Sequence, residues 1–346
     1  MNNEDVFDVP KPKTKLFGER AARVTTAEMN EVFEEIRAIF SGSTYISRMD
    51  LSKPLPSKED HGDIDIVVET SPGMDLKEYI RSHLVYSDHF KNYLVEIVNN
   101  GPIMHCLFHS SAINKQVHVD FIFAPSDEYD ATLMYLAYND FSGLLGVFTR
   151  KLKFNYGNKG FYKIYVDKKG QYHYILLTHS LVDGLKMLGY GDIIHTYYNI
   201  QNNEDIAKFI GYSDLFDSSY LIGSDLNRGD RKRMRAGRPS ARDLKGKLVD
   251  LNKKRIQMDD DHYFKSLFPE KYTEYLAKCK AIEDYVPPKS KYNGNWLMQK
   301  FPAIKPGPII GKIQLYWMKR YGDQIDSVDE NQLISDTSQY IAENTI

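Results

Sequence analysis

Two aspartates, Asp63 and Asp65, lie in a short apolar segment with the sequence Gly62-Asp63-Ile64-Asp65-Ile66-Val67-Val68, which is typical of a β-strand. Because side chains alternate along a strand, both carboxylates face one side and the isoleucines face the core. The two carboxylates are then about 7 Å apart. In apolar surroundings they repel each other and lose hydration, unless a cation lies between them.

A third aspartate, Asp120, has a similar setting. Alternation across Val117–Phe123 predicts a buried valine and phenylalanine face and places Asp120 opposite, on the side of His118. If the two strands are neighbours, three carboxylates converge on one sheet face, and such oxygen ligands suit Mg²⁺ or Mn²⁺. The alternative is three solvent-facing acids. His118 either supports Asp120 or is a partly exposed strand histidine.

A Gly42-Ser43 pair precedes the aspartate strand. It follows an amphipathic helix predicted to open at a capping box, Thr25-x-x-Glu28. Backbone N–H groups and a hydroxyl at such a turn could hold phosphates. The other interpretation is that the pair only ends the helix.

This order of features resembles the DNA polymerase β-like nucleotidyltransferase superfamily: a helix, Gly-Ser, Gly-Asp-x-Asp on a strand, and a third Asp on a later strand. The segment 62–66 looks especially like family-X polymerases, and a looser likeness in order continues to about residue 195. Segment 305–313 is similar to a short part of the helical region of tRNA nucleotidyltransferases and poly(A) polymerases.

The resemblance implies an enzyme that transfers a nucleotide from an NTP or dNTP to a hydroxyl and releases pyrophosphate. Two Mg²⁺ (or Mn²⁺) ions would be bridged by Asp63 and Asp65. Asp120 would bind the catalytic metal and help deprotonate the attacking hydroxyl. Gly42 and Ser43 would hold the β- and γ-phosphates.

One departure from family-X polymerases is the spacing of 21 positions between Gly42 and Asp63, which is longer than expected. The intervening segment carries Arg48, Lys53 and Lys58, any of which could reach a triphosphate, and we choose Arg48. Residues 138–141 fall where the family reads the incoming sugar and base; an ordinary helix end is the alternative.

A basic segment runs from Arg228 to Arg255. It has twelve basic and three acidic residues, a local charge of +9 in a chain whose net charge is −2. This asymmetry favours a polyanionic partner, and we expect a nucleic-acid acceptor to contact the arginine-rich part. The residues chosen for this role are Arg231, Lys232, Arg233 and Arg235.

The composition of the 346 residues is that of a globular protein, with 42% apolar and 27% charged residues. Two cysteines, Cys106 and Cys279, cannot form a disulfide framework, and we expect a cytoplasmic protein with no signal peptide and no membrane segment. The spacing of the ten histidines shows no zinc motif.

We therefore expect an α+β fold with a nucleotidyltransferase-type mixed sheet and flanking helices, followed by a mainly helical C-terminal domain. The expected divisions are an arm (1–24), a catalytic domain (25–130), a palm- and thumb-like extension (131–199) and a helical domain (200–346). Two other functions stay open: transfer to a protein or small-molecule hydroxyl, and non-catalytic nucleic-acid binding on the same fold.

Overall fold

The computed structural model describes residues 16–70, 75–86, 93–191, 193–221, 239–284, 291–304 and 308–343. Two compact units make up the chain, Met1–Lys280 and Ala281–Ile346. The first unit contains all the sheets and the candidate site, and the second is helical. The described residues are thus of mixed α and β structure.

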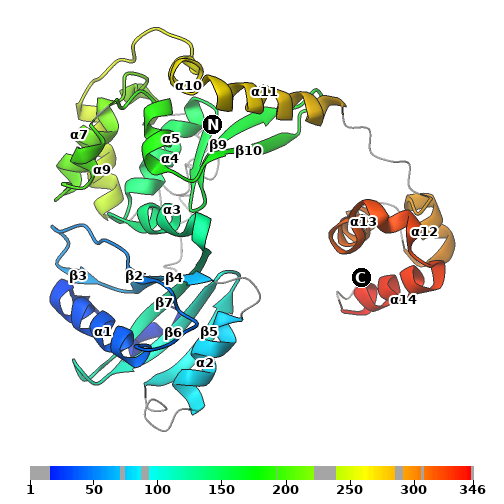
Figure 1. Ribbon diagram of the computed structural model, residues 1–346, viewed down its shortest axis with the longest axis horizontal. Coiled ribbons are helices and arrows are strands. Elements are labelled where there is room, and N and C mark those ends of the chain that lie inside the picture. Colours follow the sequence, from blue (N-terminus) through cyan, green and yellow to red (C-terminus); the bar gives the residue numbers. More distant parts are fainter. Residues whose placement is uncertain are drawn as a thin grey trace, which may run out of the picture. The chain divides into compact units, whose positions relative to one another are not determined.

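A five-stranded sheet has the order β2-β4-β7-β6-β5 (Figure 1). Its strands β4 and β7 are parallel, and the other neighbouring pairs are antiparallel. The strands are β2 (Met49–Leu51), β4 (Ile64–Thr70), β5 (Leu94–Asn100), β6 (Ile103–Ser110) and β7 (Lys115–Pro125). The predicted hairpin of two strands around 103–109 and 117–123 is therefore confirmed, as β6 and β7.

Helices cover both faces of this sheet. On one face, α1 (Thr26–Ile39) and α2 (Leu76–Tyr86) enclose the main core, which includes Ile64, Ile66, Val119 and Phe121. The capping box predicted at the start of the first helix is present: Thr25 accepts from the Glu28 N–H, and Glu28 accepts from the Thr25 N–H. On the other face, Tyr129 of α3 (Ser126–Leu136) packs against Val67 and Ala124.

The remainder of the first unit consists of a second sheet, a short strand pair and further helices. A three-stranded antiparallel sheet has the order β10-β9-β8. Its strands are β8 (Phe154–Gly157), β9 (Gly160–Val166) and β10 (Tyr172–Thr178), and the two-stranded pair is β1 (Val24–Thr25) with β3 (Asp60–His61). The helices are α4 (Phe141–Lys151), α5 (Leu181–Met187), α6 (Ile194–Tyr197), α7 (Asn203–Tyr212), α9 (Pro239–Asp250), α10 (His262–Leu267) and α11 (Pro269–Asp284). Short 3₁₀ turns lie at Gly18–Arg20 and Ser218–Leu221.

The second unit consists of α12 (Gly294–Lys300), α13 (Pro308–Tyr321) and α14 (Glu330–Glu343), with a 3₁₀ segment at Gly322–Ser327. These helices pack around Trp317, whose indole N–H donates to the Thr337 hydroxyl at 2.9 Å. The segment 308–313 singled out in the sequence lies at the start of α13, and residues 305–307 lie outside the described residues.

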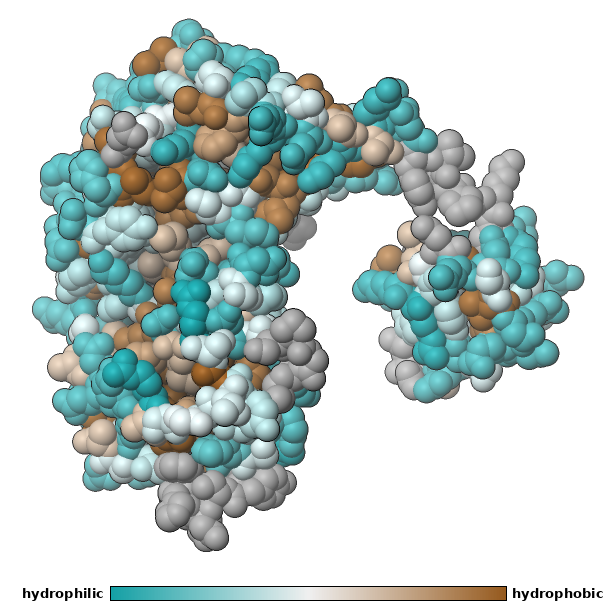
Figure 2. Space-filling view, in the orientation of Figure 1, coloured by the Kyte–Doolittle hydropathy of each residue, from teal (hydrophilic) through white to brown (hydrophobic). Residues whose placement is uncertain are grey.

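The surfaces visible in Figure 2 are mostly hydrophilic, with small hydrophobic patches. No described helix combines the length and the apolar character that crossing a membrane requires.

Candidate functional site

The parallel pairing of β4 with β7 places Asp65 directly beside Asp120. Asp63 lies one residue before β4, and the same register places it next to His118. Their neighbours Ile64, Val119 and Phe121 point into the core, so the acids occupy the opposite face of the sheet. The predicted convergence of carboxylates from two adjacent strands is therefore confirmed for the backbone register.

The surroundings of the Asp65 carboxyl strongly disfavour its charged form. Burial, together with the nearby charges of Asp63 and Asp120, raises the pKa of Asp65 to about 7; His118 and Lys58 act in the opposite direction. A carboxyl with these neighbours resists ionisation unless a cation compensates. The oxygen donors and their mutual repulsion fit a divalent cation such as Mg²⁺ or Mn²⁺ at this position.

A cavity of about 230 Å³ opens beside the aspartates. Its walls come from α1, from the segment between β2 and β4 that includes β3, from β4 itself, and from α3, α4 and the turn joining them. The polar and charged residues that line it are Ser52, Lys53, Lys58, His61, Asp63, Asp65, Tyr135, Asn139 and Ser142. Acids thus form one wall, and two lysines bring positive charge to the same cavity.

Backbone and side-chain contacts hold the cationic wall. The Ser52 N–H donates to the Asp65 carbonyl at 2.9 Å, which fixes the start of the loop against β4. The Lys53 ammonium donates to the Tyr198 carbonyl at 2.9 Å, and the Lys58 ammonium lies 3.4 Å from the Asn139 side-chain oxygen. An anion in the cavity would therefore meet two positioned ammonium groups beside the acids.

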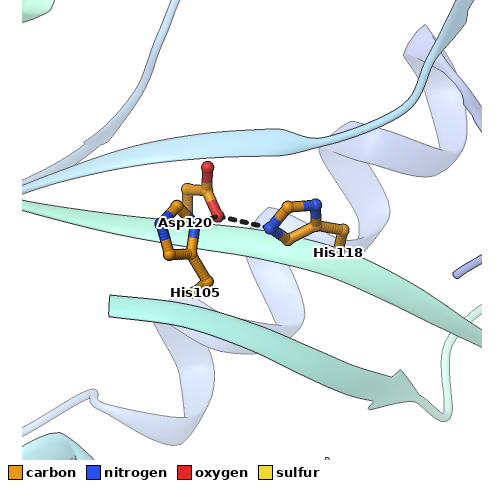
Figure 3. Close-up of side chains that lie close together, drawn as sticks. All are labelled: His105, His118 and Asp120. Atoms are coloured by element: carbon orange, nitrogen blue, oxygen red, sulfur yellow. Dashed lines mark hydrogen bonds and ion pairs between the residues drawn. The ribbon is translucent and has the colours of Figure 1, made fainter. Parts of the chain in front are cut away.

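Two histidines hold the Asp120 carboxylate (Figure 3). Its Oδ1 lies 2.7 Å from His105 Nδ1 and 2.6 Å from His118 Nε2. His105 is the cross-strand partner of Asp120 in the β6–β7 pair, and His118 precedes Asp120 on the same face of β7. Burial opposes the charge of His118, but the close contact with the Asp120 carboxylate outweighs it and raises the pKa of His118. Of the two sequence interpretations of His118, the structure supports contact with Asp120.

The predicted phosphate residues lie elsewhere on the domain. Gly42 and Ser43 follow the end of α1, where Gly42 has a φ of +81° and the Ser43 hydroxyl accepts from the Tyr45 N–H. Neither lines the cavity of the aspartates. The Arg48 carbonyl accepts a hydrogen bond from the Glu69 N–H. Glu69 lies four residues farther along β4 than Asp65, so the Arg48 backbone is about 13 Å along the strand from the aspartates. The Arg48 guanidinium pairs with Asp130 at 2.5 Å and covers the Tyr129 ring.

The predicted acceptor residues Arg231, Lys232, Arg233 and Arg235 lie outside the described residues. Farther along the same basic segment, several cations have partners within the chain. The Lys253 ammonium donates to the carbonyls of Tyr212 and Ser213, and Arg255 pairs with Asp260 at 2.7 Å. This end of the segment therefore stabilises the fold.

Sequence reasoning did not single out His105. An available signal was the hairpin register: the turn between β6 and β7 pairs Ser110 with Lys115, and counting outward from that pair brings His105 opposite Asp120. From the sequence we favour Arg48 over Lys53 and Lys58, whereas the two lysines line the cavity of the aspartates and Arg48 does not. Comparison of the sequence with protein-family models and with curated protein sequences finds no match to either.

Proposed function

We propose that this protein is a metal-dependent nucleotidyltransferase that transfers a nucleotide from an NTP or dNTP to a hydroxyl group and releases pyrophosphate. The observation that carries the proposal is the parallel register of β4 and β7, which brings Asp65 next to Asp120 with Asp63 beside them. A lysine-bearing cavity opens at the same acids. Carboxylates next to ammonium groups suit a substrate that arrives as a metal-bound polyphosphate.

Each residue contributes a distinct part. Asp63 and Asp65 would hold two Mg²⁺ or Mn²⁺ ions between them, and Asp120 would hold one of these ions. When bound, such ions neutralise phosphate charge and favour ionisation of the attacking hydroxyl. Lys53 and Lys58 would bind the phosphate oxygens, a role that we assign to them because they line the cavity and Arg48 does not. The imidazoles of His105 and His118 would keep the Asp120 carboxylate in one orientation.

The acceptor that we favour is a nucleic-acid hydroxyl, because of the +9 charge of residues 228–255. Transfer to a protein or small-molecule hydroxyl would need no such basic surface for a polyanion. A purely non-catalytic role is disfavoured because Asp65 and Asp120, which lie side by side and are at least partly buried, reduce stability when they bind nothing.

The test is incubation of the full chain with each labelled NTP and dNTP, Mg²⁺ or Mn²⁺, and separate acceptors: tRNA, single-stranded RNA or DNA, and primed duplexes. We expect label on one acceptor class with release of pyrophosphate. Asp63→Asn, Asp65→Asn and Asp120→Asn should each lose several kcal/mol of transition-state stabilisation, about a thousandfold or more in rate.

The matched control is Asp130→Asn, which removes an exposed aspartate of α3 that pairs with Arg48 outside the cavity. It should keep near wild-type activity. Robust turnover by a folded Asp120→Asn variant would contradict the assignment of that residue. Absence of transfer to every acceptor by the folded wild-type protein would contradict the proposed function.

A further inference from the structure

The cluster of His105, His118 and Asp120 has the composition of a metal site distinct from the aspartate trio. One ligand atom from each residue lies within 4.8 Å of the others. The cluster shares only Asp120 with that trio.

The donor set consists of two imidazole nitrogens and one carboxylate oxygen. Mg²⁺ prefers oxygen ligands only, whereas imidazole suits Zn²⁺ and its neighbours in the first transition series. Three such ligands with a fourth position left for water is a common arrangement for Zn²⁺. We propose that His105, His118 and Asp120 form a binding site for one Zn²⁺ ion.

The distances are close to those that the ion requires. Zn²⁺ at about 2.0–2.1 Å from each of three tetrahedral ligands separates the ligand atoms by about 3.3 Å. The two histidine nitrogens lie 2.7 Å and 2.6 Å from Asp120 Oδ1, and the ring centroids are 5.6 Å apart. Binding therefore needs each contact to Asp120 to lengthen by about 0.6–0.7 Å, which small side-chain rotations provide.

The surroundings favour a bound ion over water. The side chains of His105, His118 and Asp120 are 15%, 15% and 12% exposed, and the rings of His118 and Phe17 form a T-shaped contact with centroids 4.9 Å apart. The His118 Nε2 atom is fully buried, and although it is close to Asp120 it has no hydrogen bond of regular geometry. A buried nitrogen that makes no regular hydrogen bond is a suitable metal ligand, because its lone pair is available to a metal once the ring is neutral.

The site also has a rigid frame. His105 and Asp120 are paired residues of the β6–β7 hairpin, and His118 lies two positions before Asp120 on the same strand face. Sites on regular strands hold their ligands more accurately than sites on loops. This inference does not rest on the proposed function, since the hairpin would bind Zn²⁺ whether or not the aspartate trio transfers nucleotides.

The experiment uses the full chain after treatment with a chelator, without nucleotide. Calorimetric titration with Zn²⁺, carried out in millimolar Mg²⁺ to occupy the carboxylate site, should show one Zn²⁺ ion per chain. His105→Gln and His118→Gln should each weaken binding by at least about 100-fold, since loss even of an outer partner of a metal ligand costs 10–100-fold. Millimolar Mg²⁺ should not displace the Zn²⁺. The control is His173→Gln: His173 of β10 lies 2.9 Å from Asp167 and belongs to no such cluster in the part of the chain that the structure describes. It should bind Zn²⁺ as the wild type does.

Co²⁺ provides a second measurement on the wild-type protein. A four-coordinate site should give intense visible absorption, which Zn²⁺ should abolish. The proposal is overturned if Co²⁺ shows only the weak spectrum of the aqueous ion, or if folded His105→Gln and His118→Gln bind Zn²⁺ as tightly as the wild type. Circular dichroism checks the fold of each variant, and if both variants unfold, the wild-type Co²⁺ spectrum alone decides. None of these signals requires nucleotide transfer, so failure here is distinguishable from failure of the proposed function.

Discussion

Replacing Asp65 by asparagine should stabilise the protein in the absence of metal, although it should abolish activity. Asp65 ionises near pH 7 in the folded chain, against an ordinary pKa of 3.8. Between these values the folded state holds a proton that the unfolded state has lost, so stability falls as pH rises through this window. Above about pH 7 the loss of folding stability caused by Asp65 has reached its full size.

The magnitude follows from the size of the shift. About three pKa units at 1.36 kcal/mol each correspond to about 4 kcal/mol, an upper bound because nearby groups adjust. The asparagine side chain carries no charge at any pH. The Asp65→Asn variant should therefore exceed the wild type in free energy of unfolding by up to about 4 kcal/mol at pH 8, and the gap should narrow steadily toward pH 5.

Urea unfolding in EDTA at pH 5, 6, 7 and 8 measures this gap. Asp130→Asn serves as the control, and its small effect should not vary with pH, because an exposed ion pair contributes little. Added Mn²⁺ at pH 8 should stabilise the wild type more than Asp65→Asn and so reduce or reverse the difference. If Asp65→Asn is no more stable than the wild type at pH 8 in EDTA, burial among like charges does not raise the pKa of Asp65.

Three further outcomes are expected. Lys58→Ala should weaken the affinity for Mg²⁺-NTP by about 1.5–3 kcal/mol, because Lys58 lines the cavity. Gly42→Val, at a position whose φ is +81°, should lower the melting temperature and leave that affinity nearly unchanged. If a binding titration shows the reverse pattern, the Gly42 turn and not Lys58 is the phosphate site. Replacing the arginines and the lysine of segment 231–235 by alanine should flatten the dependence of nucleic-acid affinity on salt without changing NTP binding, and an unaltered slope would exclude that segment as the acceptor surface. Glu35→Ala should lose about 1.5–3 kcal/mol of stability in urea unfolding, because the Glu35 carboxylate accepts hydrogen bonds from the turn of the β6–β7 hairpin. The control is Glu34→Ala at the neighbouring exposed residue, and an equal loss of stability in both variants would contradict this role of Glu35.

Local patterns in the sequence were enough to place the three aspartates on one face. Alternation along each strand assigns Asp63 and Asp65 to the side opposite Ile64 and Ile66, and the structure has this arrangement because the isoleucines join the core beneath α1 and α2. The capping box at Thr25 likewise acts within four residues, so the sequence alone identifies it.

The parts of the site that depend on distant packing were not accessible in the same way. Strand β5 lacks a strict alternation of apolar and polar residues, so the local sequence does not predict this strand. The choice among Arg48, Lys53 and Lys58 depends on which end of β4 each residue lies beside. That is decided by the pairing of β2 with β4, which is not visible in the local sequence. Arg48 also finds a partner, Asp130, that is 82 positions away.

The β4–β7 pairing also bears on how the site comes into existence as the chain folds. His105 and Asp120 are 15 residues apart in one hairpin, whereas Asp65 and Asp120 are 55 residues apart and meet only through a non-local parallel pair. Bringing distant segments together carries a larger loop-closure entropy than closing a hairpin, and such contacts slow folding. A chain that has formed only the hairpin already has the histidines around Asp120, but its Asp65 is still hydrated and ionises as an ordinary carboxyl. The raised pKa of Asp65 is therefore a marker of the completed sheet.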